Sequence, residues 1–199
     1  MEDRTRTPDG TFPRPLIVPD DTPLCVDLDG TLIAGDTLVL SLRLLATTAP
    51  WSIPAVVIAL LHGRAALKSA LAAKVVPDPA SLPWRAAVVA FVREQRASGR
   101  RVLLATAAHR RIAESVAAYL GCFDGIVASE GTANAKGAAK VDAIRRALGR
   151  DTPFDYVGDS AADLPVFAVA RWSYLVAPTT AVRDQALRLG RIQRIFDDV

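Results

Sequence analysis

The sequence predicts an α/β protein in which helices cover both faces of a parallel β-sheet. Two observations carry this prediction: short apolar runs recur along the chain, and helical patterns alternate with them. Such runs are typical of parallel strands, because those strands are buried on both faces. The strands are expected at residues 24–29, 101–106, 125–128, 154–157 and 173–176, and the helices that alternate with them at 109–120, 136–148, 162–170 and 180–189.

The composition agrees with this class and excludes others. The 199 residues are 51% hydrophobic and 23% charged, with a net charge of +3, which excludes a disordered chain. No basic run is present, so no nucleic-acid partner is expected. The two cysteines form no metal-binding motif, and the polar N-terminus is unlike a secretory signal, so we expect a cytoplasmic protein with reduced thiols. Residues 1–23 hold five of the thirteen prolines and are predicted to form a flexible N-terminal arm.

A helical insertion interrupts the alternation after the first strand. Helical patterns at 37–47, 53–61 and 64–74 precede a proline-rich link, and a further helix at 82–98 returns the chain to the sheet. We therefore expect residues 37–84 to form a cap and residues 24–36 and 85–199 to form the core.

One apolar stretch of the insertion has the length of a membrane span. Residues 44–61 carry no charge, but Pro50 and Pro54 disfavour a regular spanning helix. A cap that packs its own helices and a surface that contacts a membrane or a lipid substrate are the two remaining interpretations.

Two carboxylates follow the first strand in the motif DLDGT, at Asp27 and Asp29. Alternation along a strand aims both side chains in one direction, and Gly30 permits a tight turn. One carboxylate can then attack phosphorus while the other donates a proton to the leaving oxygen. A simple turn is the alternative interpretation, since Asp-Gly is common in turns.

Polar residues also follow the other strands. Asp159, in the motif GDSAAD, is expected to meet Asp27 at the carboxyl edge of the sheet, where two carboxylates suit Mg²⁺. Asp163 either supports that site or only favours the N-terminus of its helix. Thr106, with the backbone of Ala107 and Ala108, is a candidate for binding a phosphate.

Two lysines compete for the role of neutralising phosphoryl oxygens. Lys136 lies in the motif NAKG, 23 residues before Asp159, and Lys140 follows one turn later. Arg43, His62, Arg64 and Lys68 of the insertion are candidates for contacting an anionic substrate, although solvated charges explain them equally well.

Taken in order, DLDGT, Thr106, NAKG and GDSAAD resemble the four motifs of the haloacid dehalogenase (HAD) superfamily. The resemblance implies a Rossmannoid fold and a Mg²⁺-dependent phosphatase that passes through an aspartyl-phosphate. It implies that Asp27 is the nucleophile and a metal ligand, and that Asp29 is the general acid/base and binds the metal through its carbonyl. Asp159 would complete the metal site, with Asp163 behind it. The phosphate would be held by Thr106, Ala107 and Lys136.

Finer similarities suggest a subgroup. The place of the insertion resembles the C1 cap of phosphoserine phosphatases, and the spacing of NAKG in those enzymes favours Lys136 over Lys140. Ala162 departs from the pattern, because many relatives carry Asn there. Residues 23–34, 61–71 and 155–166 are similar to the HAD domain fused to prenyltransferases of the UbiA family.

These similarities imply a phosphorylated small molecule, or a prenyl- or sugar-linked phosphate, as substrate. They also imply a membrane surface or a prenyltransferase as partner, with membrane association as the alternative to a purely cytoplasmic location. Two alternative functions remain at this point: a phosphomutase, and a non-catalytic accessory domain of a membrane prenyltransferase.

Overall fold

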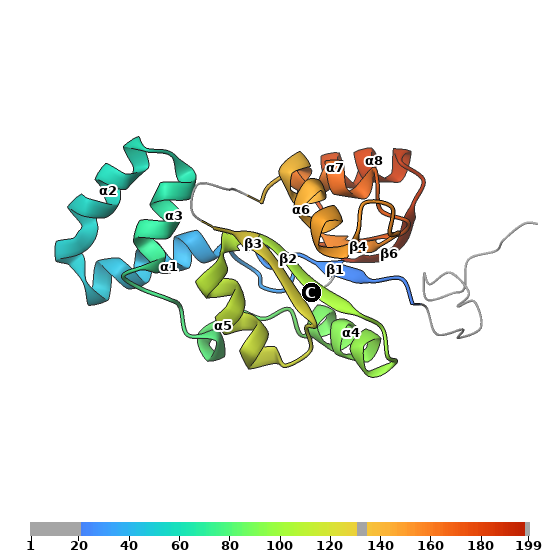
Figure 1. Cartoon of the computed structure of the whole chain (residues 1–199), viewed down its shortest axis with the longest axis horizontal. Helices are drawn as coiled ribbons and strands as arrows, with labels where there is room; N and C mark the ends of the chain where they lie inside the picture. Colours follow the sequence, from blue (N-terminus) through green and yellow to red (C-terminus); the bar gives the residue numbers. More distant parts are fainter. Residues whose placement is uncertain (1–20, 131–134, 198–199) are drawn as a thin grey trace, which may run out of the picture.

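Six parallel strands form one central sheet in the computed structural model, which describes residues 21–130 and 135–197 (Figure 1). The strand order is β3-β2-β1-β4-β5-β6, and every neighbouring pair is parallel. The strands are β1 (Leu24–Val26), β2 (Val102–His109), β3 (Gly125–Ser129), β4 (Asp155–Gly158), β5 (Ser173–Val176) and β6 (Ile192–Phe196). The expected α/β class with a Rossmannoid parallel sheet is confirmed.

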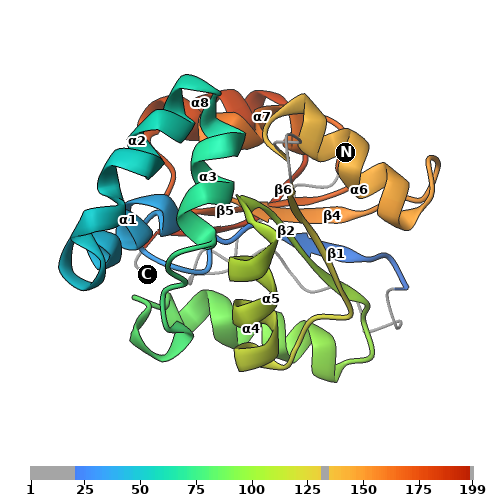
Figure 2. The ribbon, with the colours of Figure 1, turned by 60° about the vertical axis from the view of Figure 1, so that its left-hand side comes forward.

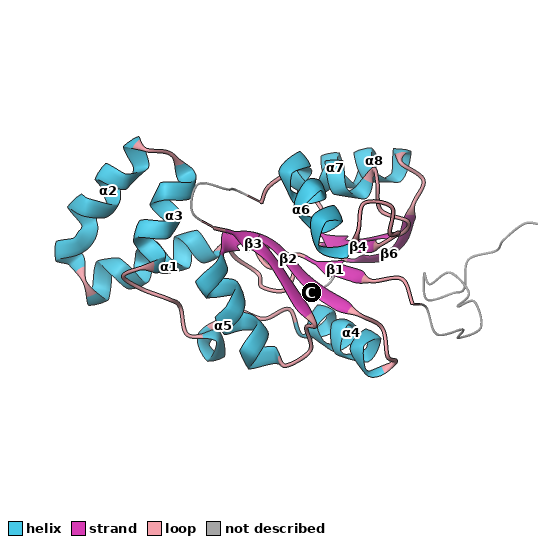
Figure 3. Ribbon diagram, in the orientation of Figure 1, coloured by secondary structure: helices cyan, strands magenta, loops and turns pink. Residues whose placement is uncertain are grey.

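Helices cover both faces of this sheet (Figures 2 and 3). One face packs on α4 (Ala86–Ala97) and α5 (Arg110–Leu120), and the other on α6 (Ala138–Leu148), α7 (Leu164–Phe167) and α8 (Thr180–Arg188). The central strand β1 is completely buried between the two layers. Its Leu24 and Val26 belong to one apolar core and its Cys25 to the other, as alternation along a strand requires.

The structure differs from the sequence prediction at several element boundaries. The last strand, β6, was not predicted. The helix expected at 162–170 is a 3₁₀ turn, Ala161–Asp163, followed by the short α7. Residues 1–20 of the expected N-terminal arm lie outside the described residues. Thr22 and Pro23 already accept hydrogen bonds from Arg100 and Asp155, next to the sheet.

The insertion after β1 is helical, as expected. It contains α1 (Thr37–Thr48), the 3₁₀ turn Pro50–Ser52, α2 (Ile53–Leu61) and α3 (Arg64–Ala72), followed by a second 3₁₀ turn at Pro79–Ser81. The three α-helices share a small core that is separate from the two cores of the sheet, made by Leu45, Val56, Leu67, Leu71 and Val75. Figure 1 shows them beyond one end of the sheet, with α2 farthest out.

Among the described residues, no single helix has the length and apolarity needed to cross a membrane. The pair formed by Thr37–Thr48 and Pro50–Leu61 meets that test only when the two are taken together, and the chain bends by 117° between them.

Candidate active site

A cavity of about 310 Å³ lies between the carboxyl edge of the sheet and the helical insertion. Ligands of open α/β sheets bind at this edge. The sheet side supplies Asp27, Asp29, Ala107 and Asp159, and the insertion supplies residues of α1 and α3. The predicted convergence of the DLDGT and GDSAAD motifs is therefore present in the structure.

Asp27 lies directly after β1 and is almost completely buried. One carboxylate oxygen, Oδ1, accepts a hydrogen bond from the Leu28 backbone N–H at 2.8 Å, and Oδ2 accepts one from Lys140 Nζ at 2.8 Å. Burial raises the pKa of Asp27 to about 7, assisted by the charges of Asp163 and Asp29, while Lys140 opposes the rise. The carboxylate is thus held in one orientation at the cavity wall.

Asp29 lines the same cavity, and α1 holds its side chain. The Thr37 backbone N–H donates to Oδ1 at 2.7 Å, and the Thr37 hydroxyl donates to Oδ2 at 3.2 Å. Burial raises the pKa of Asp29 to about 6, and the two hydrogen bonds from Thr37 partly oppose this. A carboxyl group with a pKa in this range can both release and accept a proton near neutral pH.

Asp159 follows β4 and approaches the turn after β1. Its Oδ1 accepts a hydrogen bond from the Thr31 hydroxyl at 3.2 Å. Burial raises its pKa to about 6, and the neighbouring Asp163 charge adds to the rise. Gly30 leaves the space that this carboxylate occupies: a Cβ atom at Gly30 would lie 2.1 Å from Asp159 Oδ2.

Asp27, Asp159 and Asp163 form a candidate metal site, because one carboxylate oxygen from each lies within 4.8 Å of the others. Carboxylate oxygens are the ligands that Mg²⁺ prefers. Asp163, however, is fully buried and already accepts hydrogen bonds from Lys140, Tyr156 and Ser160. The donor set therefore fits Mg²⁺ with Asp27 and Asp159 as direct ligands and Asp163 as their support.

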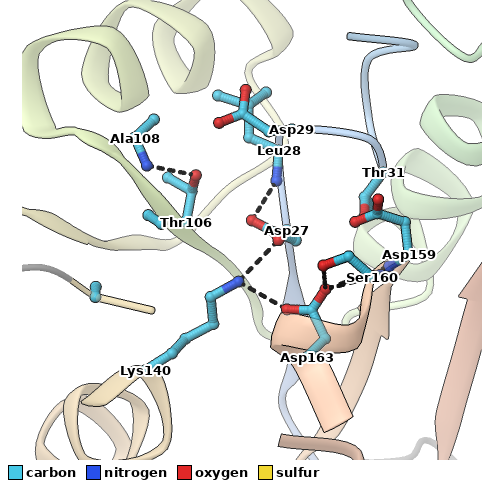
Figure 4. A network of polar contacts seen from close by, with 12 residues as sticks. Asp27, Leu28, Asp29, Thr31, Thr106, Ala108, Lys140, Asp159, Ser160 and Asp163 are labelled. Carbon is cyan, nitrogen blue, oxygen red and sulfur yellow. Dashed lines mark hydrogen bonds and ion pairs between the residues drawn. The ribbon is translucent and has the colours of Figure 1, made fainter. Parts of the chain in front are cut away.

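Lys140 connects Asp27 and Asp163 from within the core (Figure 4). Its Nζ lies 2.8 Å from Asp27 Oδ2, 3.0 Å from Asp163 Oδ1 and 2.7 Å from the Tyr156 hydroxyl. Burial alone would lower its pKa, but the charges of Asp27 and Asp163 outweigh burial and raise it to about 12. Lys140 is consequently charged in the folded protein, and all three of its ammonium protons can be engaged.

Lys136 occupies a different position from Lys140. It is exposed, lines the cavity and precedes α6, which begins at Ala138 after Gly137 with φ +60°. The spacing of NAKG favours Lys136, whereas the geometry brings Lys140, the competing candidate, to Asp27. The sequence contains a signal for Lys140: it shares a helix face with Ile144, which is also buried.

The segment at the end of β2 is placed partly as expected. Ala107 and Ala108 line the cavity, and the Ala107 carbonyl accepts hydrogen bonds from Lys68 and Ser129. Thr106 is fully buried, is not among the lining residues, and its hydroxyl accepts a hydrogen bond from the Ala108 N–H at 3.0 Å.

The insertion contributes two of the predicted cations, Arg64 and Lys68, and two residues that were not predicted from the sequence, Thr37 and Ser41. Arg64 and Lys68 line the cavity, whereas Arg43 and His62 do not. Thr37 positions Asp29, as described above. Ser41 lines the cavity with a fully buried hydroxyl that has no hydrogen-bond partner among the described residues.

Comparison with known proteins gives a family and several structural neighbours. The family described as haloacid dehalogenase-like hydrolase matches residues 24–168. An uncharacterized protein of Sinorhizobium fredii, y4nM, is 38% identical over 163 residues; the match covers 77% of this chain and 30% of y4nM. The matched part of this chain thus spans less than a third of that relative's length.

Two solved structures illustrate the shared fold. A Bordetella pertussis protein of unknown function has a TM-score of 0.66 and 17% identity, with 89% of this chain and 99% of that one covered. A phosphoserine phosphatase solved as a phospho-aspartyl intermediate analogue has a TM-score of 0.57 and 16% identity, with 89% of this chain and 94% of that one covered.

Proposed function

Because this chain belongs to the haloacid dehalogenase-like hydrolase family, we propose that it is a Mg²⁺-dependent phosphomonoesterase with Asp27 as nucleophile. One observation carries the proposal: two carboxylates with distinct surroundings, Asp27 and Asp29, line one cavity together with Asp159 and several cations. The phosphoserine phosphatase with a phospho-aspartyl intermediate analogue supports an aspartyl-phosphate by its similar fold.

The first half of the reaction uses Asp27 and Asp29 in different roles. Asp27 attacks the phosphorus with a carboxylate oxygen, and the ester P–O bond breaks as the new P–O bond forms. Asp29 donates its proton to the leaving oxygen, so that an alcohol departs and Asp27 carries the phosphoryl group. Asp29 suits this role because Thr37 holds both of its oxygens and burial raises its pKa to about 6.

The second half restores the protein. Asp29, now ionised, takes a proton from a water molecule that attacks the phosphorus, and the bond to Asp27 breaks to release inorganic phosphate. Asp27 and Asp159, with the Asp29 carbonyl, would hold Mg²⁺. When bound, that ion would neutralise charge on the phosphoryl oxygens. Lys140 keeps Asp27 oriented, and the cavity cations Arg64, Lys68 and Lys136 attract an anionic substrate.

The size and charge of the cavity also support a proposal for the class of substrate. A cavity of about 310 Å³ with basic residues on the insertion side suits a phosphate monoester whose organic part carries polar or anionic groups. Sugar-linked phosphates belong to this class. Prenyl-linked phosphates, whose organic part is apolar, are a second candidate that rests on the similarity to prenyltransferase-linked domains alone.

The Asp27→Asn variant tests the proposed nucleophile. We expect it to hydrolyse p-nitrophenyl phosphate at less than about 1% of the wild-type rate, because an amide oxygen is a poor nucleophile. Wild-type activity should require Mg²⁺ and vanish on treatment with EDTA. Asp151→Asn, in an exposed turn, is the matched control and should behave like wild type. Substantial activity of a folded Asp27→Asn protein would remove Asp27 from this role.

A panel of phosphorylated metabolites, including prenyl and sugar phosphates, would identify the substrate. The rate with each compound should depend on Asp27, and kcat/KM should separate the physiological class from generic aryl phosphates. Transfer of the phosphoryl group to a sugar instead of water would show a phosphomutase.

A further inference from the structure

The outer end of the helical insertion exposes an unusual amount of apolar surface. Eight of the thirteen exposed large apolar side chains in the described residues lie between Val39 and Leu61. Trp51 and Leu61 are the most exposed, at 77% and 83%. We define the apolar tip as Trp51, Ile53, Val57, Ile58, Leu60 and Leu61.

Helix α2 is the centre of this surface. Its sequence, IPAVVIALL, is apolar on every side, yet Val56 is its only buried residue. A helix that is apolar all round is normally enclosed by other parts of a protein or by lipid. Here α2 lies at the far end of the molecule, away from the sheet (Figure 1). A groove bounded only by apolar side chains, including Leu42 and Val57, runs beside it.

The apolar tip is not part of the catalytic cavity. None of its six residues lines that cavity, so a substrate bound at Asp27 would leave the tip exposed. Large exposed apolar side chains concentrated in one short segment mark a surface that contacts another apolar phase or molecule.

The charge around the tip indicates which partner it contacts. The insertion, residues 37–84, contains four basic residues, Arg43, Arg64, Lys68 and Lys74, and one acidic residue, Asp78, which gives it a charge of +3. Arg43, Arg64 and Lys74 are exposed. A second copy of the segment would bring like charges together, whereas an anionic lipid surface has the opposite charge.

We propose that the apolar tip docks onto the surface of an anionic lipid bilayer. Trp51 and Leu61 enter the boundary between headgroups and acyl chains, and the exposed basic residues contact the headgroups. Apolar side chains with a tryptophan at one face and basic residues beside them are the composition of membrane-surface helices. The proposal is tested separately from the proposed phosphatase activity, because the six residues of the apolar tip do not line the Asp27 cavity; of the three exposed basic residues, Arg64 alone also lines it.

Vesicle sedimentation tests the proposal on the 199-residue chain. We expect the protein to sediment with vesicles of phosphatidylcholine and phosphatidylglycerol, to bind pure phosphatidylcholine more weakly, and to be released partly by salt. The double variant Trp51→Ser/Leu61→Ser should bind about tenfold more weakly, since two large apolar side chains no longer enter the lipid. Leu187→Ser/Leu189→Ser removes exposed apolar side chains elsewhere and should bind like wild type.

Tryptophan quenching locates the contact. Brominated phosphatidylcholine in anionic vesicles should quench the fluorescence of Trp51, and this component should disappear in Trp51→Phe although that variant still sediments. Equal sedimentation of the two double variants would overturn the proposal. So would a dimer, found by analytical ultracentrifugation, that shields Trp51 and leaves the protein unable to bind vesicles.

Discussion

Lys140 is the buried one of the four lysines, and its side chain bridges Asp27 and Asp163. A buried ion pair of this kind orients its partners more than it adds net stability, because desolvation offsets the attraction. Removing one member is nevertheless costly, since the remaining charges lose their partner. Tyr156 contributes to the same network by donating to Asp163, and burial raises its pKa well above the usual value, which keeps the hydroxyl protonated.

Substitution by methionine should separate the roles of the two lysines. Lys140→Met should lower the free energy of unfolding by about 3–5 kcal/mol, because Asp27 and Asp163 lose their buried counter-ion. Lys136→Met should change stability by less than about 0.5 kcal/mol, as exposed substitutions do, and should reduce kcat/KM for an aryl phosphate. Urea unfolding and steady-state kinetics measure the two effects.

The opposite result would show that Lys140, and not Lys136, neutralises the charge on the phosphoryl oxygens. If Lys136→Met kept wild-type kinetics and Lys140→Met remained folded but inactive, Lys140 would act directly on the phosphoryl group. The sequence could not decide this because the two lysines lie four residues apart and both fall in the predicted helix 136–148. The actual start of α6 at Ala138 leaves Lys136 in the preceding loop and places Lys140 in the first turn.

The turn between β1 and α1 positions two of the carboxylates of the site, Asp159 and Asp29. Gly30 adopts φ +76° and lies so close to Asp159 that a side chain has no space. The same turn ends at Asp36, which caps α1 through the Leu38 and Val39 backbone N–H groups, and α1 in turn presents Thr37 to Asp29. Both sides of the cavity therefore depend on this short segment.

Gly30→Ala should weaken Mg²⁺ dependence specifically. Its Cβ would displace the Asp159 carboxylate, so we expect the Mg²⁺ concentration for half-maximal activity to rise by about tenfold or more. Gly99→Ala is the matched control, because Gly99 has φ +88° with no atom within 4 Å of the added Cβ. Both variants should lose about 1–2 kcal/mol of stability from backbone strain. Identical Mg²⁺ titrations for the two variants would contradict a role for Asp159 at the metal.

At the scale of elements, the apolar strands and the helices of the insertion could be predicted to within a few residues. Their patterns are unambiguous because buried parallel strands are continuously apolar and because Gly63 and the prolines interrupt the helices. Strand β6 could not be predicted, since Gln193 and Arg194 interrupt its apolar residues. Such a pattern is tolerated at β6 because it is an edge strand, with one neighbour only.

Across the whole molecule, the two ends of the parallel strands differ in function: the carboxyl edge of the sheet forms the cavity, and the amino edge stabilises the fold. The carboxyl edge collects Asp27, Asp29 and Asp159 in the cavity. That convergence could be predicted from the parallel direction of the strands, because parallel strands end at the same side of the sheet. The contribution of Thr37 and Ser41 of the insertion to the cavity could not be predicted from the sequence, because it depends on how α1 packs against the sheet.

At the amino edge of the sheet, Asp155 at the start of β4 connects the chain segments that precede the strands. This carboxylate is 1% exposed and pairs with Arg100, which precedes β2, and with Arg171, which precedes β5. It also accepts a hydrogen bond from the Trp172 backbone N–H at 3.1 Å, and Arg100 donates to the Thr22 carbonyl next to β1 at 2.7 Å. One carboxylate thus connects the segments that lead into four strands.

Asp155→Asn should therefore destabilise the whole fold without changing the chemistry. We expect the free energy of unfolding in urea to fall by about 3–5 kcal/mol, because the nearly buried Arg100 loses its counter-ion. The kcat of the folded fraction should stay at the wild-type value, because Asp155 lies at the edge of the sheet opposite the cavity. Asp197→Asn breaks the exposed pair with Arg183 and should cost less than about 1 kcal/mol. Equal stability losses in the two variants would show that the amino edge does not depend on Asp155.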